Sequence, residues 1–200
     1  MILLKSNAEN IFWFGRYLAR TQYLCSKFPF QADDEALQYA SAFCLEAEDA
    51  ESLNQLVLDP TQSCSLVQLF QYAKDNIHDL RAVLSAKAYA ELNALIRTAN
   101  QNSHYICDIA SDCQDVLETE AEDIFLFFSF GQMVEKFDRD LRLNQDTEDT
   151  MRSLDFIVRA LQEKGWLGLE HSWSDLKFLP NQMNFYQFSD RIHQLFESNV

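Results

Sequence analysis

Glu135, Asp138 and Arg142 are the residues of this sequence best placed to do chemistry. They are spaced by three and four positions, so on a helix they lie on one face. Either carboxylate could serve as a general base in amide chemistry, and Glu135 and Asp138 are therefore the candidate catalytic residues. A solvated helix surface with an internal ion pair has the same spacing. Both interpretations stay open at this point.

A second polar stripe lies near the start of the chain. Glu9, Trp13, Arg16 and Arg20 are spaced by four, three and four residues. Trp13 lies between Glu9 and Arg16, where an exposed indole could act as a cation–π platform. Guanidinium groups bind carboxylates and phosphates with paired N–H donors, so this stripe predicts a binding pocket or an interface, with an ordinary surface helix as the alternative.

Two carboxylate–histidine pairs suggest a metal site. Asp75 with His78, and Asp190 with His193, each place a carboxylate and an imidazole one helical turn apart. Ferritin-like sites instead use Glu-x-x-His from two helices and a glutamate from each of two others. The sequence also contains no Ser/His/Asp or Cys/His arrangement and no phosphate-binding glycine loop. We therefore expect no metal and no cofactor, with a di-metal helical bundle as a minor alternative.

Helices must position these groups, because the chain has few turn-forming residues. Four glycines and three prolines in 200 residues are too few for a strand-rich fold. The apolar periodicity predicts helices over 6–25, 33–43, 50–58, 66–84, from 85 to about 100, 106–117, 120–143 and 147–163. Residues 168–200 are expected to form a packed tail with one possible short helix from 184 to 196. The prediction is an all-α bundle of about seven to nine helices in a single domain, 1–200.

The first helix and the long helix after residue 120 share a pattern. Aligned with itself at an offset of 116 residues, the chain places Gly15 on Gly131. The matching spine positions are Ile11, Phe14, Leu18, Thr21 and Cys25 with Phe127, Phe130, Val134, Phe137 and Leu141. A glycine inside a helix costs about 1 kcal/mol relative to alanine, so two such glycines predict a close approach of another backbone. We interpret this as a pseudo-repeated core helix, with chance similarity as the alternative.

The polar face is not shared by the two copies. Ala19, Gln22 and Ser26 stand where the second copy has Glu135, Asp138 and Arg142. An asymmetric polar cluster is therefore expected at the crossing of the two helices, formed by Arg16, Arg20, Arg81, Glu135 and Asp138.

The net charge of −15, from 16 basic and 31 acidic residues, bears on partners. Nucleic acids and anionic membrane surfaces attract positively charged proteins, so neither is an expected partner. The first residues resemble neither a signal peptide nor a membrane span, which predicts a cytoplasmic location. Five cysteines without a C-x-x-C pair predict reduced, buried thiols.

Three stretches, in order, resemble the alpha-E domain family of bacteria. Residues 8–18, AENIFWFGRYL, followed by Arg20, resemble the pattern A-E-N-L-Y-W-L-G-R-Y-L-E-R-A-E. Residues 73–93 are similar to a second family stretch through Asn76, Arg81 and Tyr89, and residues 130–142 resemble L-G-R-x-x-E-R-A-D-x-x-x-R. The sequence departs from these patterns at Ala19, Gln22, His78 and Gln132.

The resemblance implies a function only indirectly. Members are typically encoded beside ATP-grasp amide ligases, which implies a role in making or modifying a peptide. Carried over by position, the candidate binding residues are Glu9, Asn10, Trp13, Arg16, Arg20, Asn76, Arg81 and Arg142. We expect an auxiliary protein that binds an ATP-grasp ligase or its peptide substrate through this cluster. A catalytic role of Glu135 and Asp138 is the alternative, and the oligomeric state stays open.

Overall fold

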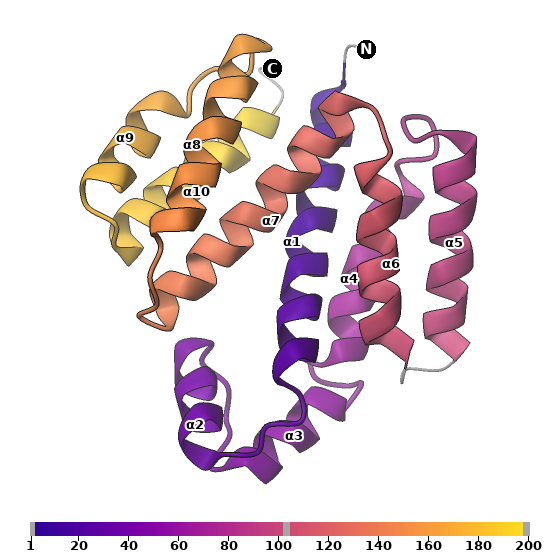
Figure 1. Ribbon diagram of the computed structural model, residues 1–200, viewed down its shortest axis with the longest axis vertical. Coiled ribbons are helices and arrows are strands. Elements are labelled where there is room, and N and C mark those ends of the chain that lie inside the picture. Colours follow the sequence, from indigo (N-terminus) through magenta and orange to yellow (C-terminus); the bar gives the residue numbers. More distant parts are fainter. Residues whose placement is uncertain (1–2, 102–104, 198–200) are drawn as a thin grey trace.

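The computed structural model describes residues 3–101 and 105–197 (Figure 1). The described residues form ten α-helices and no strands, so the predicted all-α class is confirmed. The helices are α1 (Lys5–Lys27), α2 (Asp33–Ala42), α3 (Ala50–Leu58), α4 (Leu66–His78), α5 (Ala86–Gln101), α6 (Ile106–Glu118), α7 (Glu122–Arg142), α8 (Glu148–Glu163), α9 (Glu170–Phe178) and α10 (Gln182–Phe196). The count exceeds the expected seven to nine.

The additional helix, α9, comes from the C-terminal segment. We expected a packed tail with one possible short helix, but this segment folds into both α9 and α10. The apolar residues Leu169, Trp173 and Leu176 of the first part are buried at helical spacing. Trp173 also donates a hydrogen bond from Nε1 to Asp155 of α8 at 2.9 Å. Packing against α10, with this bond to α8, thus stabilises a short helix with weak intrinsic periodicity.

Two predicted helix ends differ from the structure. Helix α1 begins at Lys5, one residue before the predicted start, with Leu4 at the N-cap position. The apolar spine that predicted a helix through residue 84 continues beyond the end of α4 at His78. Leu80 and Leu84 are buried in the turn that follows, so their spacing reports burial and not helix. Ser85 caps the start of α5, where the next helix was predicted to begin, since its Oγ accepts a hydrogen bond from the N–H of Ala88 at 3.1 Å.

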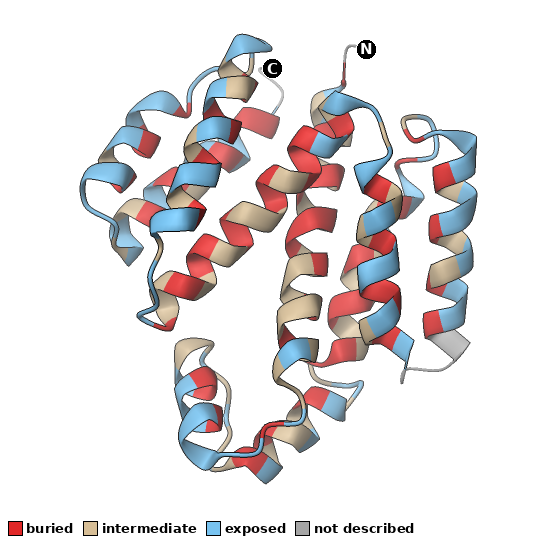
Figure 2. Ribbon diagram, in the orientation of Figure 1, coloured by how far each residue is buried: buried red, intermediate tan, exposed pale blue. Residues whose placement is uncertain are grey.

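Helix α1 lies at the centre of the molecule and packs chiefly against α7 and α4 (Figure 1). Helices α4, α5 and α6 lie on one side of it, α8, α9 and α10 lie on the other, and α2 and α3 lie beyond its C-terminal end. Buried residues concentrate on α1 and α7 (Figure 2). Phe12 of α1 contacts Phe130 of α7 and Phe196 of α10, with ring centroids 5.3 and 5.5 Å apart.

The close approach predicted at the two helical glycines is confirmed. A Cβ atom on Gly15 would lie 2.3 Å from the carbonyl oxygen of Phe128, and one on Gly131 would lie 2.0 Å from that of Phe12. The contact is reciprocal, because each glycine faces the residue three positions before the other. The backbones of α1 and α7 therefore touch at this crossing, whereas the pseudo-repeat itself stays a prediction.

The prediction of five reduced cysteines was wrong. Cys25, near the end of α1, forms a disulfide with Cys107, at the start of α6, across 82 residues. Of the three free cysteines, Cys113 is buried but Cys44 is exposed. Local spacing cannot reveal a pair so distant in sequence, because only the packing of α6 against α1 brings the two thiols together.

Removing this disulfide should destabilise the protein. We expect the double variant Cys25→Ser/Cys107→Ser to lower the free energy of unfolding by about 2–4 kcal/mol, because the bond closes a long loop in the unfolded chain. Guanidinium denaturation measures this, and wild-type protein in reductant should lose a similar amount. Cys44→Ser is the matched control and should change little. A wild-type curve unaffected by reductant would contradict the assignment.

The disulfide also bears on the expected location. Structural disulfides are typical of oxidising compartments, so the cysteines do not support the cytoplasm, and that location stays a prediction. Within residues 3–101 and 105–197, no helix has the length and apolar character needed to cross a lipid bilayer.

Candidate functional site

The crossing of α1 and α7 brings together five of the predicted site residues. Arg16 and Arg20 project from α1, and Glu135, Asp138 and Arg142 project from α7. Arg16 follows Gly15 directly, and Glu135 lies one helical turn after Gly131. The backbone contact at the glycines therefore holds the charged side chains of the two helices within hydrogen-bonding distance.

Glu135 is the centre of this ion cluster. Its Oε2 accepts hydrogen bonds from Nε of Arg16 and from Nη2 of Arg20, both at 2.9 Å. Its Oε1 accepts a hydrogen bond from Nε of Arg20 at 2.5 Å. Nη2 of Arg16 lies 2.8 Å from Oε2. Glu135 is only 3% exposed. Two guanidinium groups thus occupy both oxygens of a buried carboxylate, the geometry of strong charge-assisted hydrogen bonds.

The electrostatics agree with the geometry. Burial by itself raises the pKa of Glu135, but the charges and hydrogen bonds of Arg16 and Arg20 outweigh it, and the pKa lies below its ordinary value of 4.5. A general base near neutral pH needs a pKa near the working pH and a free oxygen. Glu135 has neither, so this geometry does not favour the catalytic role predicted for it.

Asp138 and Arg142 extend the cluster toward α2. Oδ1 of Asp138 accepts Nε of Arg142 at 2.7 Å, and its Oδ2 lies 3.5 Å from Nη2 of Arg16. Nη1 of Arg142 donates to the carbonyl of Ala42 at 3.3 Å, which connects the end of α7 to the end of α2. Three guanidinium groups face two carboxylates, so the cluster keeps one net positive charge.

Only the edges of the cluster reach solvent. The side chain of Arg20 is 33% exposed and that of Arg142 is 22% exposed, whereas Arg16 and Asp138 are buried. Arg20 borders a small pocket of about 200 Å³ with Tyr39 and Cys64. Any ligand of the cluster would therefore have to bind through Arg20 or Arg142.

Trp13 is placed differently from the expectation of an exposed indole. It is partly buried and packs between Tyr17 and His193 of α10, with ring centroids 5.8 and 5.6 Å away. The guanidinium carbon of Arg16 lies 5.2 Å from its ring, so the predicted cation–π contact is present. Trp13 thus anchors the C-terminal helix, and α10 covers the surface that the sequence suggested was open.

Four other predicted residues lie outside the ion cluster. Glu9 and Asn10 are half-buried near the start of α1, and Arg16 pairs with Glu135 instead of Glu9. Asn76 donates from Nδ2 to the carbonyl of Tyr72 in its own helix at 2.7 Å. Arg81 is exposed in the turn after α4, so its predicted place in the cluster was wrong.

Sequence reasoning missed a polar hollow on the other side of the crossing. It has a volume of about 360 Å³ and is lined by Ala19, Gln22, Tyr23, Gln114, Gln132, Met133, Lys136 and Arg139. The departures at Ala19, Gln22 and Gln132 could have indicated it. Gln114 of α6 carries no such indication, because only tertiary packing places it there.

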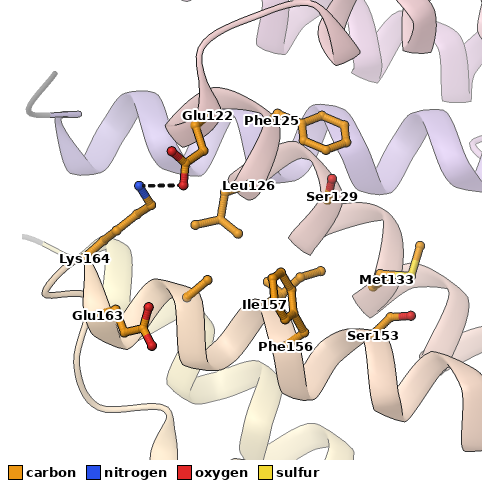
Figure 3. Close-up of a pocket in the computed structure, with 11 residues that line it drawn as sticks. Glu122, Phe125, Leu126, Ser129, Met133, Ser153, Phe156, Ile157, Glu163 and Lys164 are labelled. Carbon is orange, nitrogen blue, oxygen red and sulfur yellow. Dashed lines mark ion pairs between the residues drawn. The ribbon is translucent and has the colours of Figure 1, made fainter.

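An apolar groove between α7 and α8 was also missed (Figure 3). Its volume is about 830 Å³. Phe125, Leu126 and Met133 of α7 face Phe156 and Ile157 of α8 across it. Phe156 is 74% exposed, which is unusual for a large aromatic side chain without a partner.

The carboxylate–histidine pairs do not converge on a site. His193 stacks on Trp13, and Asp75 accepts a hydrogen bond from Gln71. In the part of the chain that the structure describes, no three His, Cys, Asp or Glu side chains lie together as metal ligands would.

Comparison with known proteins identifies the family. The Alpha-E model, described as a predicted alpha-helical domain with a conserved ER motif, matches residues 30–150, more than half of the chain. No curated protein and no solved structure matches the sequence significantly. The match includes Glu135 but not the first helix, and the sequence has no Glu-Arg dipeptide. The chain belongs to the Alpha-E family.

Proposed function

We propose that this protein is a non-catalytic helical subunit of an ATP-grasp-linked peptide or amide ligation system. Its task in this proposal is to bind the ligase. The observation that carries the proposal is the exposed apolar groove between α7 and α8, together with an ion cluster whose two carboxylates are already paired with arginines of the protein itself. Alpha-E membership, with the ligase neighbourhood that the sequence resemblance implies, supports the choice of partner.

The ion cluster supports a binding role over a catalytic one. Its two carboxylates are committed to Arg16, Arg20 and Arg142, and breaking these pairs would leave buried charges without partners. The cluster therefore acts as a clamp that fixes α7 against α1. A rigid α7 in turn supports one wall of the groove.

The groove has the features of a protein-binding surface. Its floor is aliphatic and aromatic, and exposed aromatic side chains such as Phe156 are typical binding hot spots. At one end, Lys164 pairs with Glu122 at 3.1 Å (Figure 3). It also pairs with Asp123 at 2.9 Å. Glu163 also lines the groove, so its carboxylates outnumber this one ammonium. The occupant that fits is an apolar helix of the ligase with basic residues at its end.

Copurification with an ATP-grasp ligase of the same organism tests the proposal. We expect the wild-type protein to bind the ligase in mild salt and Phe156→Asp to weaken binding at least tenfold, because a charge replaces the exposed anchor. Phe156 is exposed, so the melting temperature should not fall.

Leu58→Asp is the matched control. Leu58 is 58% exposed and is the last residue of α3, a helix that lies away from α7 and α8 (Figure 1). Its variant should bind normally. The proposal fails if the wild-type protein does not associate with the ligase, or if Leu58→Asp weakens binding as much as Phe156→Asp.

A further inference from the structure

The polar hollow beside α1 and α7 is the counterpart of the ion cluster. Gly15 contacts Phe128 and Gln132, while Gly131 contacts Phe12 and Arg16, so positions 116 apart have matching surroundings at the crossing. By this correspondence, Gln132 stands for Arg16, Lys136 for Arg20, and Ala19 for Glu135. All three of these residues line the hollow.

One group is missing from the hollow compared with the ion cluster. The cluster has two cationic side chains that hold one glutamate. The hollow keeps a cation at Lys136 and an amide donor at Gln132, but the glutamate position is Ala19, whose methyl side chain leaves space. The space is therefore located where a carboxylate lies on the other side.

A hydrogen-bonded network fixes the amide donors. Oε1 of Gln114 accepts Nε2 of Gln22 at 3.0 Å and Nε2 of Gln132 at 3.1 Å. Nε2 of Gln22 also donates to the carbonyl of Ala110 at 3.2 Å, so both of its N–H groups are engaged. Gln132 makes one such bond to the described residues and keeps a second N–H for a ligand.

The charges of the hollow favour an anion. Lys136 forms no hydrogen bond or ion pair with residues 3–101 or 105–197, although it is partly buried. Arg139 donates from Nε and Nη2 to Asp140 at 3.0 and 2.8 Å, which leaves Nη1 available. Its guanidinium lies 4.1 Å from the ring of Tyr23. Tyr23 and Met133 add an apolar wall beside the cations.

We propose that this hollow binds a carboxylate carried on a short aliphatic stem, as in a glutamate side chain, at the place left open by Ala19. The carboxylate accepts hydrogen bonds from Lys136 and Gln132, as Glu135 accepts hydrogen bonds from Arg20 and Arg16. The stem lies along Met133 and Tyr23. A free amino acid and an acidic peptide can both carry this carboxylate, and the titration below distinguishes between them.

The test is an NMR titration that follows the side-chain amides of Gln22, Gln114 and Gln132. The probes are L-glutamate, a blocked tripeptide with a central glutamate, the same peptide with glutamine, and inorganic phosphate. We expect saturable shifts with at least one glutamate probe. If L-glutamate and the glutamate peptide both bind, the site recognises the glutamate side chain by itself. If only the peptide binds, the natural ligand is a peptide.

Variants of the hollow sharpen the result. Lys136→Met should weaken binding at least tenfold, whereas Lys74→Met, a partly buried lysine of α4 away from the hollow, should not change it. Ala19→Glu should abolish binding while keeping or raising the melting temperature, because its own carboxylate pairs with Lys136. If that variant fails to fold, Lys136→Met decides.

Three results would overturn the proposal. The first is the absence of saturable shifts with either glutamate probe. The second is equal binding of the glutamine peptide or of phosphate, since either would show that a carboxylate is not what the site selects. The third is an unchanged affinity in Lys136→Met.

Discussion

Gly131→Ala is expected to lower the free energy of unfolding by about 3 kcal/mol, although the same change in an open helix stabilises by about 1 kcal/mol. The added Cβ would lie 2.0 Å from the carbonyl oxygen of Phe12 and 2.9 Å from its carbonyl carbon. These are backbone atoms, so α1 and α7 must move apart to relieve the clash. Such movement also loosens the aromatic contacts between Phe12 and Phe130.

Urea denaturation measures this effect, with Gly165→Ala as the control. Gly165 has a φ of 88° and open space around it, so its variant should cost only the strain of a left-handed residue, about 1 kcal/mol. Gly15→Ala should resemble Gly131→Ala, because its Cβ would meet Phe128 at 2.3 Å. Unchanged stability in both crossing variants would mean that the helices are farther apart than described.

Glu135→Gln is expected to have an effect of similar size, about 3–5 kcal/mol, by removing the counter-charge of two guanidinium groups. Glutamine keeps the size of the side chain, but its amide is uncharged and has only one oxygen that can accept hydrogen bonds from the two arginines. Arg16 is buried, so its charge would be left with only Asp138 at 3.5 Å. Chemical denaturation at pH 7 measures the loss.

Two further variants test the origin of that loss. Asp149→Asn removes an exposed pair with Arg152 on α8 and should have little effect. The double variant Arg16→Met/Glu135→Met should recover part of the stability lost in Glu135→Gln, because an apolar pair leaves less uncompensated charge. If Glu135→Gln is as stable as the wild type, the cluster does not clamp the two helices.

The pairing of Glu135 with Arg16 and Arg20 also predicts how the stability of the protein depends on pH. The pKa of Glu135 is lower in the folded protein than its ordinary value of 4.5. Its contribution is therefore complete above the unfolded-state pKa and is lost as the pH falls through the folded-state pKa. Between pH 6 and pH 3, the wild type should lose more stability than Glu135→Gln, as thermal unfolding at each pH would show. Parallel pH profiles of the two proteins would contradict this assignment.

Sequence periodicity located most helices well. The predicted helix over 50–58 coincides with α3, and the predicted start at residue 33 coincides with α2. These successes share a cause, since helix formation follows local apolar spacing and the small number of glycines and prolines. Periodicity failed at Leu80 and Leu84, where burial in a turn produces helix-like spacing.

The candidate site was only partly predictable. One-face spacing correctly grouped Arg16 with Arg20 and Glu135 with Asp138, because positions three and four apart on a helix are neighbours. That spacing could not show that Arg81 lies elsewhere or that α10 covers Trp13. It also could not show that two arginines saturate Glu135, which changes the interpretation from a base to a clamp.

By itself, the sequence determined the all-helical class, the placement of most helices and the backbone contact at Gly15 and Gly131. Each of these depends on patterns within one helix or on the cost of a helical glycine. Only the tertiary structure decided the Cys25–Cys107 disulfide, the pairing of Glu135 with Arg16 and Arg20, and the groove and the hollow that are both lined by residues of α7. These features join residues that are distant in sequence, and their distances are set by how the helices pack.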